Sequence, residues 1–157
     1  MDERFSRSSR ILGEQKMEKL NKSSVIVFGI GGVGGAVLEA LVRGGVGTVA
    51  VVDKDTVDIT NINRQIIATN DNIGEKKVDA AEKRALSINP NINFKKYDLF
   101  YLPETAEEID LSQYDFIVDA IDNVTAKLEL IERANELNIP IISSMGTGNK
   151  LHPELFE

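Results

Sequence analysis

Residues 25–34, which run VIVFGIGGVG, decide the fold of this chain. The first four are apolar, as expected for a buried strand, and the next six satisfy the pattern G-x-G-x-x-G. Glycines in such a loop let backbone N–H groups approach an anion at the amino end of the following helix. Helically spaced apolar residues over 33–42 and a β-branched run over 48–52 complete a predicted βαβ unit. The candidate nucleotide-binding glycines are Gly29, Gly31, Gly32 and Gly34.

An acidic residue follows the second predicted strand. Asp53 lies about twenty residues beyond the last glycine of the loop, where a carboxylate can accept both hydrogens of a ribose diol. The alternative interpretation is a solvent-exposed aspartate at a strand end. ATP and NAD both carry a ribose beside phosphates, so these features predict a nucleotide site without selecting the nucleotide. A nicotinamide oxidoreductase therefore remains an alternative.

Strands and helices continue to alternate along the chain. Helices are expected at 11–20, 73–88 and 123–137, and strands at 93–97, 116–120 and 139–143. The segment 55–68 is polar and irregular, and residues 151–157 form no complete element. We therefore expect one α/β domain over residues 1–157 that is Rossmann-like, with a mainly parallel sheet and helices on both faces. A short helical segment precedes it.

The composition narrows the classes of function. The chain has 157 residues and no cysteine, which excludes disulfides, thiolate zinc sites and a cysteine nucleophile within these residues. Its net charge of -7 argues against nonspecific nucleic-acid binding by the chain as a whole. A polar amino end and the lack of a long apolar stretch favour a cytoplasmic protein without a membrane segment. Eight acidic and no basic residues lie in 98–122, whereas the first 22 residues hold six basic and four acidic ones. A polyanion should therefore approach the amino-terminal side.

The segment 53–65, DKDTVDITNINRQ, closely resembles the signature D-x-D-x-V-x-x-[ST]-N-x-x-R-Q of the ThiF/MoeB/HesA family of ubiquitin-activating-type adenylating enzymes. Residues 73–78, IGEKKV, resemble the lysine segment of that family, and residues 119–123, DAIDN, resemble its D-x-x-D-N motif. The residues around 4–13 and the stretch SSMGTGNK at 143–150 are most similar to the tRNA threonylcarbamoyladenosine dehydratase branch. The resemblance covers nearly the whole chain.

The resemblance implies ATP with magnesium, a carboxylate substrate converted to an acyl adenylate, and release of pyrophosphate. When a carboxylate attacks the α-phosphate, negative charge grows on the phosphoryl oxygens and on the leaving group, so fixed cations lower the barrier. Arg64 and Lys77 are the candidate catalytic cations, and Asn61 is a candidate hydrogen-bond donor to phosphate. Taken singly, each could be an ordinary surface residue.

Three further residues acquire candidate roles. Asp122, at the carboxyl end of a predicted strand, is a candidate catalytic residue and magnesium ligand, although an aspartate before a helix is also a favoured N-cap. Asn123 is expected on the adenine or phosphate side. By resemblance, Arg10 would reach the ATP of the other subunit in a homodimer, with Arg7 as the competing candidate.

No residue shows the pattern of a covalent nucleophile. His152 receives no role, Ser143 and Ser144 lack a nearby base, and residues 146–148 are expected to shape a substrate opening. Within the branch, the threonine carboxylate of N6-threonylcarbamoyladenosine in tRNA is adenylated and its own carbamoyl group displaces AMP.

Several alternatives remain. They are adenylation of a ubiquitin-like sulfur carrier, with a sulfur-transfer protein as a further partner, and a noncatalytic nucleotide-binding subunit. Because family members are longer, the carboxyl-terminal substrate and dimer part is expected beyond residue 157.

Overall fold

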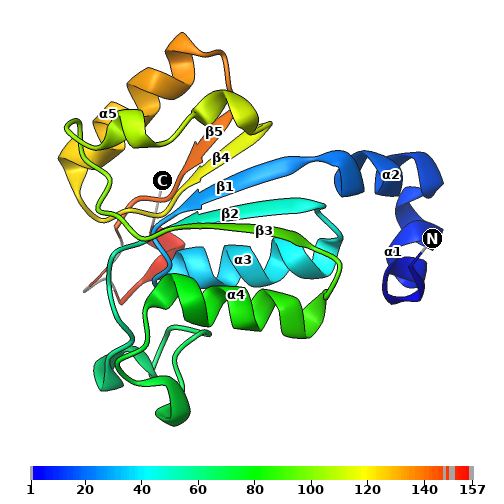
Figure 1. Ribbon diagram of the computed structural model, residues 1–157, viewed down its shortest axis with the longest axis horizontal. Coiled ribbons are helices and arrows are strands. Elements are labelled where there is room, and N and C mark those ends of the chain that lie inside the picture. The colour runs from blue at the N-terminus through cyan, green and yellow to red at the C-terminus, as the bar shows by residue number, and fades with distance from the viewer. Residues whose placement is uncertain (1, 147, 149–150, 156–157) are drawn as a thin grey trace.

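A parallel sheet forms the centre of the computed structural model, which describes residues 2–146, 148 and 151–155. Within these residues the sheet has five strands in the order β3-β2-β1-β4-β5, all parallel (Figure 1). The strands are β1 (Ser24–Phe28), β2 (Thr48–Val52), β3 (Asn93–Tyr97), β4 (Phe116–Asp119) and β5 (Ile141–Ser143). The chain builds outward from β1 to β3 and then returns to the other side of β1 at β4. The strand order therefore reverses beside β1, where open α/β sheets form a ligand crevice.

Helices cover both faces of the sheet, as the sequence predicts. Helices α3 (Gly32–Gly44) and α4 (Lys77–Ile88) lie on one face, and α5 (Val124–Glu136) lies on the other (Figure 1). Side chains along β1 alternate between the two layers, because Val25 and Val27 join the core under α3 and α4. Ile26 and Phe28 join the opposite core, which contains residues of α5 and of the segment 99–114. The all-parallel sheet with helices on both faces confirms the Rossmann-like α/β prediction.

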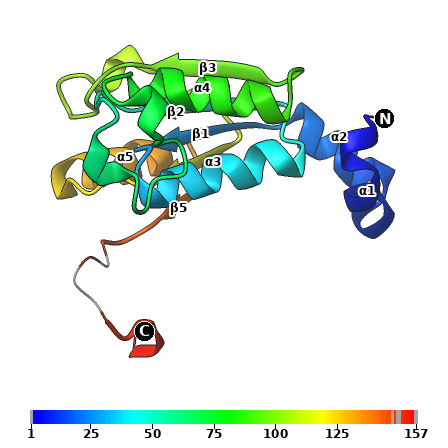
Figure 2. The same ribbon diagram turned by 90° about the horizontal axis from the view of Figure 1, so that it is seen from below.

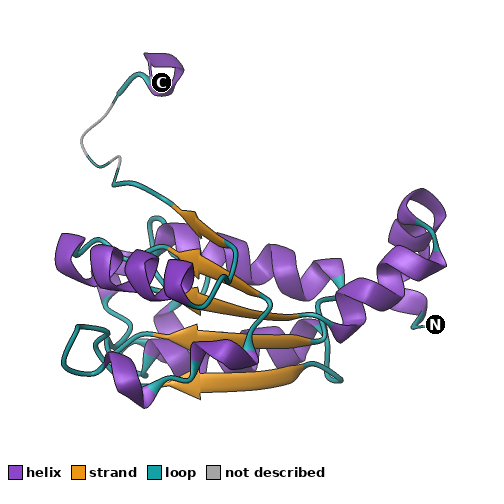
Figure 3. Cartoon of the chain, turned by 90° about the horizontal axis from the view of Figure 1, so that it is seen from above, coloured by secondary structure: helices purple, strands orange, loops and turns teal. Residues whose placement is uncertain are grey.

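Two short helices precede the sheet where one helix was expected over residues 11–20. These are α1 (Ser6–Leu12) and α2 (Glu14–Lys22). The single-helix prediction is wrong because Gly13 takes φ 83° and ψ 158°, a conformation outside the helical region. Both helices lie beyond the amino ends of the strands, since α2 leads directly into β1 (Figure 3). Figure 2 shows the same separation from below.

The helix expected over residues 73–88 begins only at Lys77. Gly74 has a φ of 87°, and Thr56 forms an antiparallel bridge with Lys76, so the residues before Lys77 belong to a turn and a bridge. Short 3-10 helices occupy Glu3–Phe5, Ile59–Asn61, Asn70–Asn72, Ala106–Glu108, Leu111–Gln113 and Pro153–Leu155. Among the described residues, no helix has the length and apolar character to cross a membrane.

Candidate functional site

The glycine loop is packed so tightly that Gly29 and Gly34 leave no room for a side chain. Gly29 has a φ of 84°, and a Cβ atom placed on it would lie 2.7 Å from the carbonyl oxygen of Ala120. A Cβ atom on Gly34 would lie 1.7 Å from the carbonyl oxygen of Gly29. Gly31 is the N-cap of α3, and no side chain caps this helix end. The first turn of α3 therefore presents backbone N–H groups to an anion, as the sequence predicts.

Asp53 lies directly against this loop at the carboxyl end of β2. Its Oδ2 atom accepts a hydrogen bond of 2.7 Å from the N–H of Ile30, and its Oδ1 atom accepts one of 2.8 Å from the N–H of Asp55. Each carboxylate oxygen can accept more than one hydrogen bond. Asp53 thus holds the loop in place and still has acceptor capacity for two ribose hydroxyls.

The turn after Asp53 is built by side-chain caps. Asp58 Oδ1 accepts hydrogen bonds from the backbone and hydroxyl of Thr60, which hold the pKa of Asp58 below its ordinary value. In return, Asn61 Oδ1 accepts a 2.9 Å hydrogen bond from the N–H of Asp58. Asn61 is buried, so it is part of the architecture of the turn. Its oxygen is engaged, which leaves its amide N–H groups as the atoms suited to a ligand.

The two candidate cations differ in their surroundings. Lys77 is 6% exposed, and its Nζ lies 3.1 Å from Oδ2 of Asp55, which is itself exposed. Arg64 is exposed, and its Nη1 donates to the carbonyl oxygen of Thr60 at 3.0 Å. The backbone of Arg64 adjoins the glycine loop, since a Cβ atom on Gly32 would lie 3.3 Å from the Arg64 carbonyl oxygen. The interpretation as an ordinary surface residue is therefore wrong for Lys77.

A cleft of about 80 Å³ opens at the carboxyl ends of β1, β2 and β4. Its lining includes Gly29, Asp53, Asp55 and Asp122 from three different connections of the sheet. Lys54 and Phe100 also line it, with the Lys54 Nζ 3.9 Å from the centre of the Phe100 ring. The glycine loop, the ribose candidate and the metal candidate thus meet in one crevice, although they are far apart in sequence.

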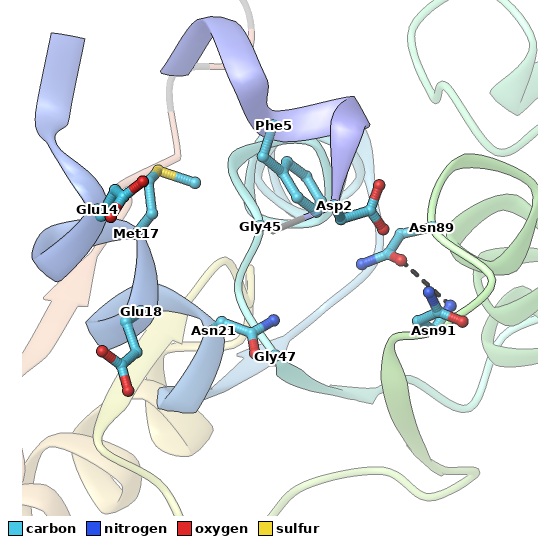
Figure 4. A pocket seen from close by; sticks show the side chains of 10 residues that line it. All are labelled: Asp2, Phe5, Glu14, Met17, Glu18, Asn21, Gly45, Gly47, Asn89 and Asn91. Carbon is cyan, nitrogen blue, oxygen red and sulfur yellow. Dashed lines mark hydrogen bonds between the residues drawn. The ribbon is translucent and has the colours of Figure 1, made fainter. Parts of the chain in front are cut away.

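A larger pocket of about 500 Å³ lies at the other end of the molecule, between α2 and the connections at the amino ends of the strands (Figure 4). Among the described residues, its lining contains the carboxylates of Asp2, Glu14 and Glu18 and no lysine or arginine. A triphosphate would be repelled there. The smaller cleft is the candidate nucleotide site because Gly29, Asp53 and Asp122 line it.

Asp122 and Asn123 have separate tasks at the start of α5. Asn123 is the N-cap, and its Oδ1 accepts a 3.0 Å hydrogen bond from the N–H of Ala126. The alternative that Asp122 caps the helix is therefore wrong. Asp122 is exposed in the cleft. The described residues contain no group of three or more side chains preassembled for a metal. Magnesium commonly needs only one or two carboxylates plus nucleotide phosphates, so Asp122 fits an ion that arrives with ATP.

Comparison with known proteins gives the family. The sequence pattern of the ThiF family matches residues 5–155. The chain belongs to the ThiF family. It is 42% identical to the tRNA threonylcarbamoyladenosine dehydratase of Bacillus subtilis, over 98% of this chain and 60% of that protein. It is 38% identical to a sulfur carrier protein adenylyltransferase of Thermus thermophilus, over 83% of this chain and 48% of that one.

A solved structure of the Escherichia coli tRNA threonylcarbamoyladenosine dehydratase, in complex with ATP, superposes with a TM-score of 0.89 at 34% identity. The match covers 96% of this chain and 62% of that one. The ThiF-family chain described here thus spans about 60% of the length of the dehydratases that it matches.

A buried ion pair in this ThiF-family chain escaped the sequence analysis. Asp119 is fully buried, and its Oδ2 accepts hydrogen bonds from Lys127 Nζ at 2.9 Å and from the Ser143 hydroxyl. Lys127 also donates to the carbonyl oxygen of Ser144 at 2.7 Å. The signal was present in the sequence, because Lys127 falls on the face of α5 that also carries Leu130 and Ala134. A lysine on a buried helical face requires a partner.

Arg10 and Arg7 are not brought to the cleft of their own chain. Both are exposed on α1, beyond the amino ends of the strands, whereas the cleft lies at the carboxyl ends (Figure 3). Thr147 of the predicted substrate loop 146–148 lies outside the described residues, as do Asn149 and Lys150 of the stretch 143–150. His152 Nδ1 lies 3.1 Å from Oε1 of Glu154.

Proposed function

We propose that the protein is an ATP-dependent tRNA threonylcarbamoyladenosine dehydratase. In this reaction the threonine carboxylate of the modified adenosine attacks the α-phosphate of ATP, and pyrophosphate leaves. The carbamoyl group of the same nucleoside then displaces AMP and closes a ring. The similarity to dehydratases across 98% of the chain is the observation that carries the proposal. The convergence of the ATP-candidate residues in one crevice supports it.

Lys77 and Arg64 are proposed to stabilise the charge that develops in the first step. Because Lys77 is buried, little water screens its charge, and a fixed cation in such a place acts strongly on a developing anion. The carboxylate of Asp55, which pairs with Lys77, is half exposed, so water can solvate it when a phosphate takes its place beside Lys77. Arg64 offers several coplanar donors that match phosphoryl oxygens.

The nucleotide itself is proposed to lie across the glycine loop. The phosphates would lie at the amino end of α3 near Gly31, Gly32 and Asn61, and the ribose at Asp53. Asp122 would hold magnesium, which neutralises phosphate charge when it is bound. Asn123 would contribute its amide N–H groups. Residues 1–157 would thus form the ATP-binding adenylation domain.

A homodimer is proposed to complete this site. Arg10 adjoins Ile11, which is 86% exposed, on a helix at the end of the sheet away from its own cleft. The segment next to Arg64 exposes Ile59, Ile62 and Ile66. Docking α1 of one protomer on this segment of its partner would bury both apolar surfaces and bring Arg10 to the partner's ATP. Arg7 lies on the same helix and is the alternative.

The charge distribution suggests how tRNA would approach. The acidic stretch 98–122 includes Asp122 in the cleft and would repel phosphate there, whereas the amino-terminal helices carry more basic than acidic residues. In the proposed dimer, the amino-terminal helices of one protomer would offer a basic surface near the cleft of the other. A cytoplasmic location follows from a tRNA substrate.

The proposal is tested with the full-length protein, ATP, magnesium and tRNA that carries N6-threonylcarbamoyladenosine. Mass analysis of the nucleosides should show an ATP-dependent product that has lost one water. The proposal would be contradicted if the nucleoside were recovered unchanged while the same protein still converted ATP to AMP in the presence of another substrate.

Adenylation of the carboxyl terminus of a ubiquitin-like sulfur carrier is the second candidate, favoured by the similarity to the Thermus thermophilus enzyme. A sulfur-transfer protein would then be a further partner. Exchange of labelled pyrophosphate into ATP that depends on a carrier protein, and not on modified tRNA, would select this alternative.

A further inference from the structure

One buried polar group at the candidate site has no partner in the described protein. Gln65 is 6% exposed, and its Oε1 atom makes no hydrogen bond. The other enclosed oxygen of this kind, Oε1 of Glu75, lies 2.6 Å from Lys83 Nζ and is accounted for by that ion pair. Buried amides are nearly always hydrogen-bonded, because an unpaired one is costly. The amide of Gln65 therefore lacks a partner that a completed site would supply.

The backbone fixes Gln65 in this position. Its N–H donates to the carbonyl oxygen of Asn61 at 2.9 Å, and its own carbonyl oxygen accepts from the N–H of Ala68 at 3.0 Å. Ile67 and Ala68 belong to the core beneath α3 and α4. These contacts anchor the backbone on both sides of Gln65.

The Gln65 amide faces the glycine loop. Its Nε2 lies 4.0 Å from the position that a Cβ atom on Gly31 would take. Gly31 begins α3, a helix of 13 residues whose amino end has no side-chain cap. Arg64, the preceding residue, contacts Gly32 of the same loop. Gln65 thus connects the helix end that suits an anion with the turn that carries Asn61 and Arg64.

We propose that Gln65 is a phosphate-binding residue of the nucleotide site, an inference that rests on the proposed use of ATP. Its Nε2 donates to a phosphoryl oxygen beside Gly31, and its enclosed Oε1 accepts from a backbone N–H of the loop. A neutral amide orients the phosphate chain without adding a third cation to Arg64 and Lys77. Pyrophosphate is then held in place during the reaction and is still free to leave.

The test compares Gln65→Met, Gln65→Glu and the control Gln15→Met, which changes an exposed glutamine of α2, in the full-length protein. Calorimetry measures the affinity for ATP with magnesium and for adenosine. Loss of a hydrogen bond to a charged group should raise the ATP Kd of Gln65→Met by about ten- to hundredfold. Gln65→Glu should weaken ATP further by like-charge repulsion, whereas the adenosine Kd and the control should match the wild type.

Thermal unfolding without nucleotide separates ligand binding from folding. Methionine removes the unpaired oxygen at similar volume, so the Tm of Gln65→Met should equal or exceed that of the wild type. An ATP Kd within twofold of the wild type would overturn the role of Gln65 and leave the proposed function standing. Equal weakening of adenosine and ATP would also overturn it. A wild-type protein that binds no ATP would overturn both proposals.

Discussion

The buried pair of Asp119 and Lys127 gives the sharpest prediction about stability. The side chain of Asp119 is 0% exposed and that of Lys127 is 8% exposed, with 2.9 Å between Oδ2 and Nζ. Lys127→Met removes the cation and leaves a carboxylate in the core. Breaking one partner of a buried pair costs about 3–5 kcal/mol, because the remaining charge is neither solvated nor compensated. We expect a loss of that size in the free energy of unfolding, measured by urea denaturation.

A double-mutant cycle shows whether the pair itself is responsible. Asp119→Asn keeps an oxygen for the N–H of Ile121, which donates to Asp119 Oδ1 at 3.0 Å. Combined with Lys127→Met, it removes both charges, so the double variant should lose less than the sum of the single variants by about 1–3 kcal/mol. Additive losses, or a cost of Lys127→Met below about 1 kcal/mol, would refute the argument.

An exposed pair provides the matched control for this experiment. Lys22 and Glu18 lie 2.6 Å apart with side chains that are 74% and 66% exposed. Lys22→Met removes the same functional group in solvent, where ion pairs contribute about 0–1 kcal/mol. A cost equal to that of Lys127→Met would show that burial is not the cause.

Three further outcomes are expected. Gly34→Ala should destabilise the protein and abolish the ATP binding measured by calorimetry, because the added Cβ would lie 1.7 Å from the carbonyl oxygen of Gly29. In the control Gly44→Ala, the added Cβ has no described atom within 4 Å, so the stability should be unchanged or higher. Lys77→Ala should lower the rate of ATP–pyrophosphate exchange by about 10²–10³-fold; Lys83→Ala, on the exposed side of the same helix, should not. The pKa of Asp58 is lowered in the folded protein, so its contribution to stability is complete above the ordinary pKa of 3.8 and is lost as the pH falls below that value. In Asp58→Asn, the free energy of unfolding should therefore fall less on acidification than in the wild type.

The parts of the fold that depend on local periodicity could be predicted from the sequence. The buried strand at 25–28 and the glycines at 29–34 placed the βαβ unit, and Asp53 was found at the expected strand end. The errors occurred where a single backbone conformation overrides apolar spacing, as at Gly13 and Gly74, both with positive φ. Glycine is compatible with several conformations, so its effect on a helix is settled by tertiary contacts.

Gln65 and Lys127 were missed for a different reason. Motif positions identify residues that are recognised one at a time, such as Lys77, whereas Gln65 and Lys127 become informative only through what surrounds them. Gln65 stood inside the quoted motif, but its unpaired oxygen is visible only when its burial is known. Lys127 lay outside the motifs, and its partner Asp119 had been noted only as a motif position. Long-range pairing of polar groups is thus the part of the site that sequence patterns do not contain.

The pair of Asp119 and Lys127 also connects stability to the candidate chemistry. Asp119 Oδ1 accepts from the N–H of Ile121, the residue before Asp122, while Lys127 holds the carbonyl oxygen of Ser144. One buried contact therefore fixes both the connection that carries the metal candidate and the start of the expected substrate loop. If the pair only stabilises the fold, Lys127→Met should show the wild-type dependence of ATP binding on magnesium at a temperature low enough for the variant to be fully folded. If it also positions Asp122, as the geometry favours, a weakened magnesium dependence should persist in the folded variant, and Lys127→Arg should restore part of it.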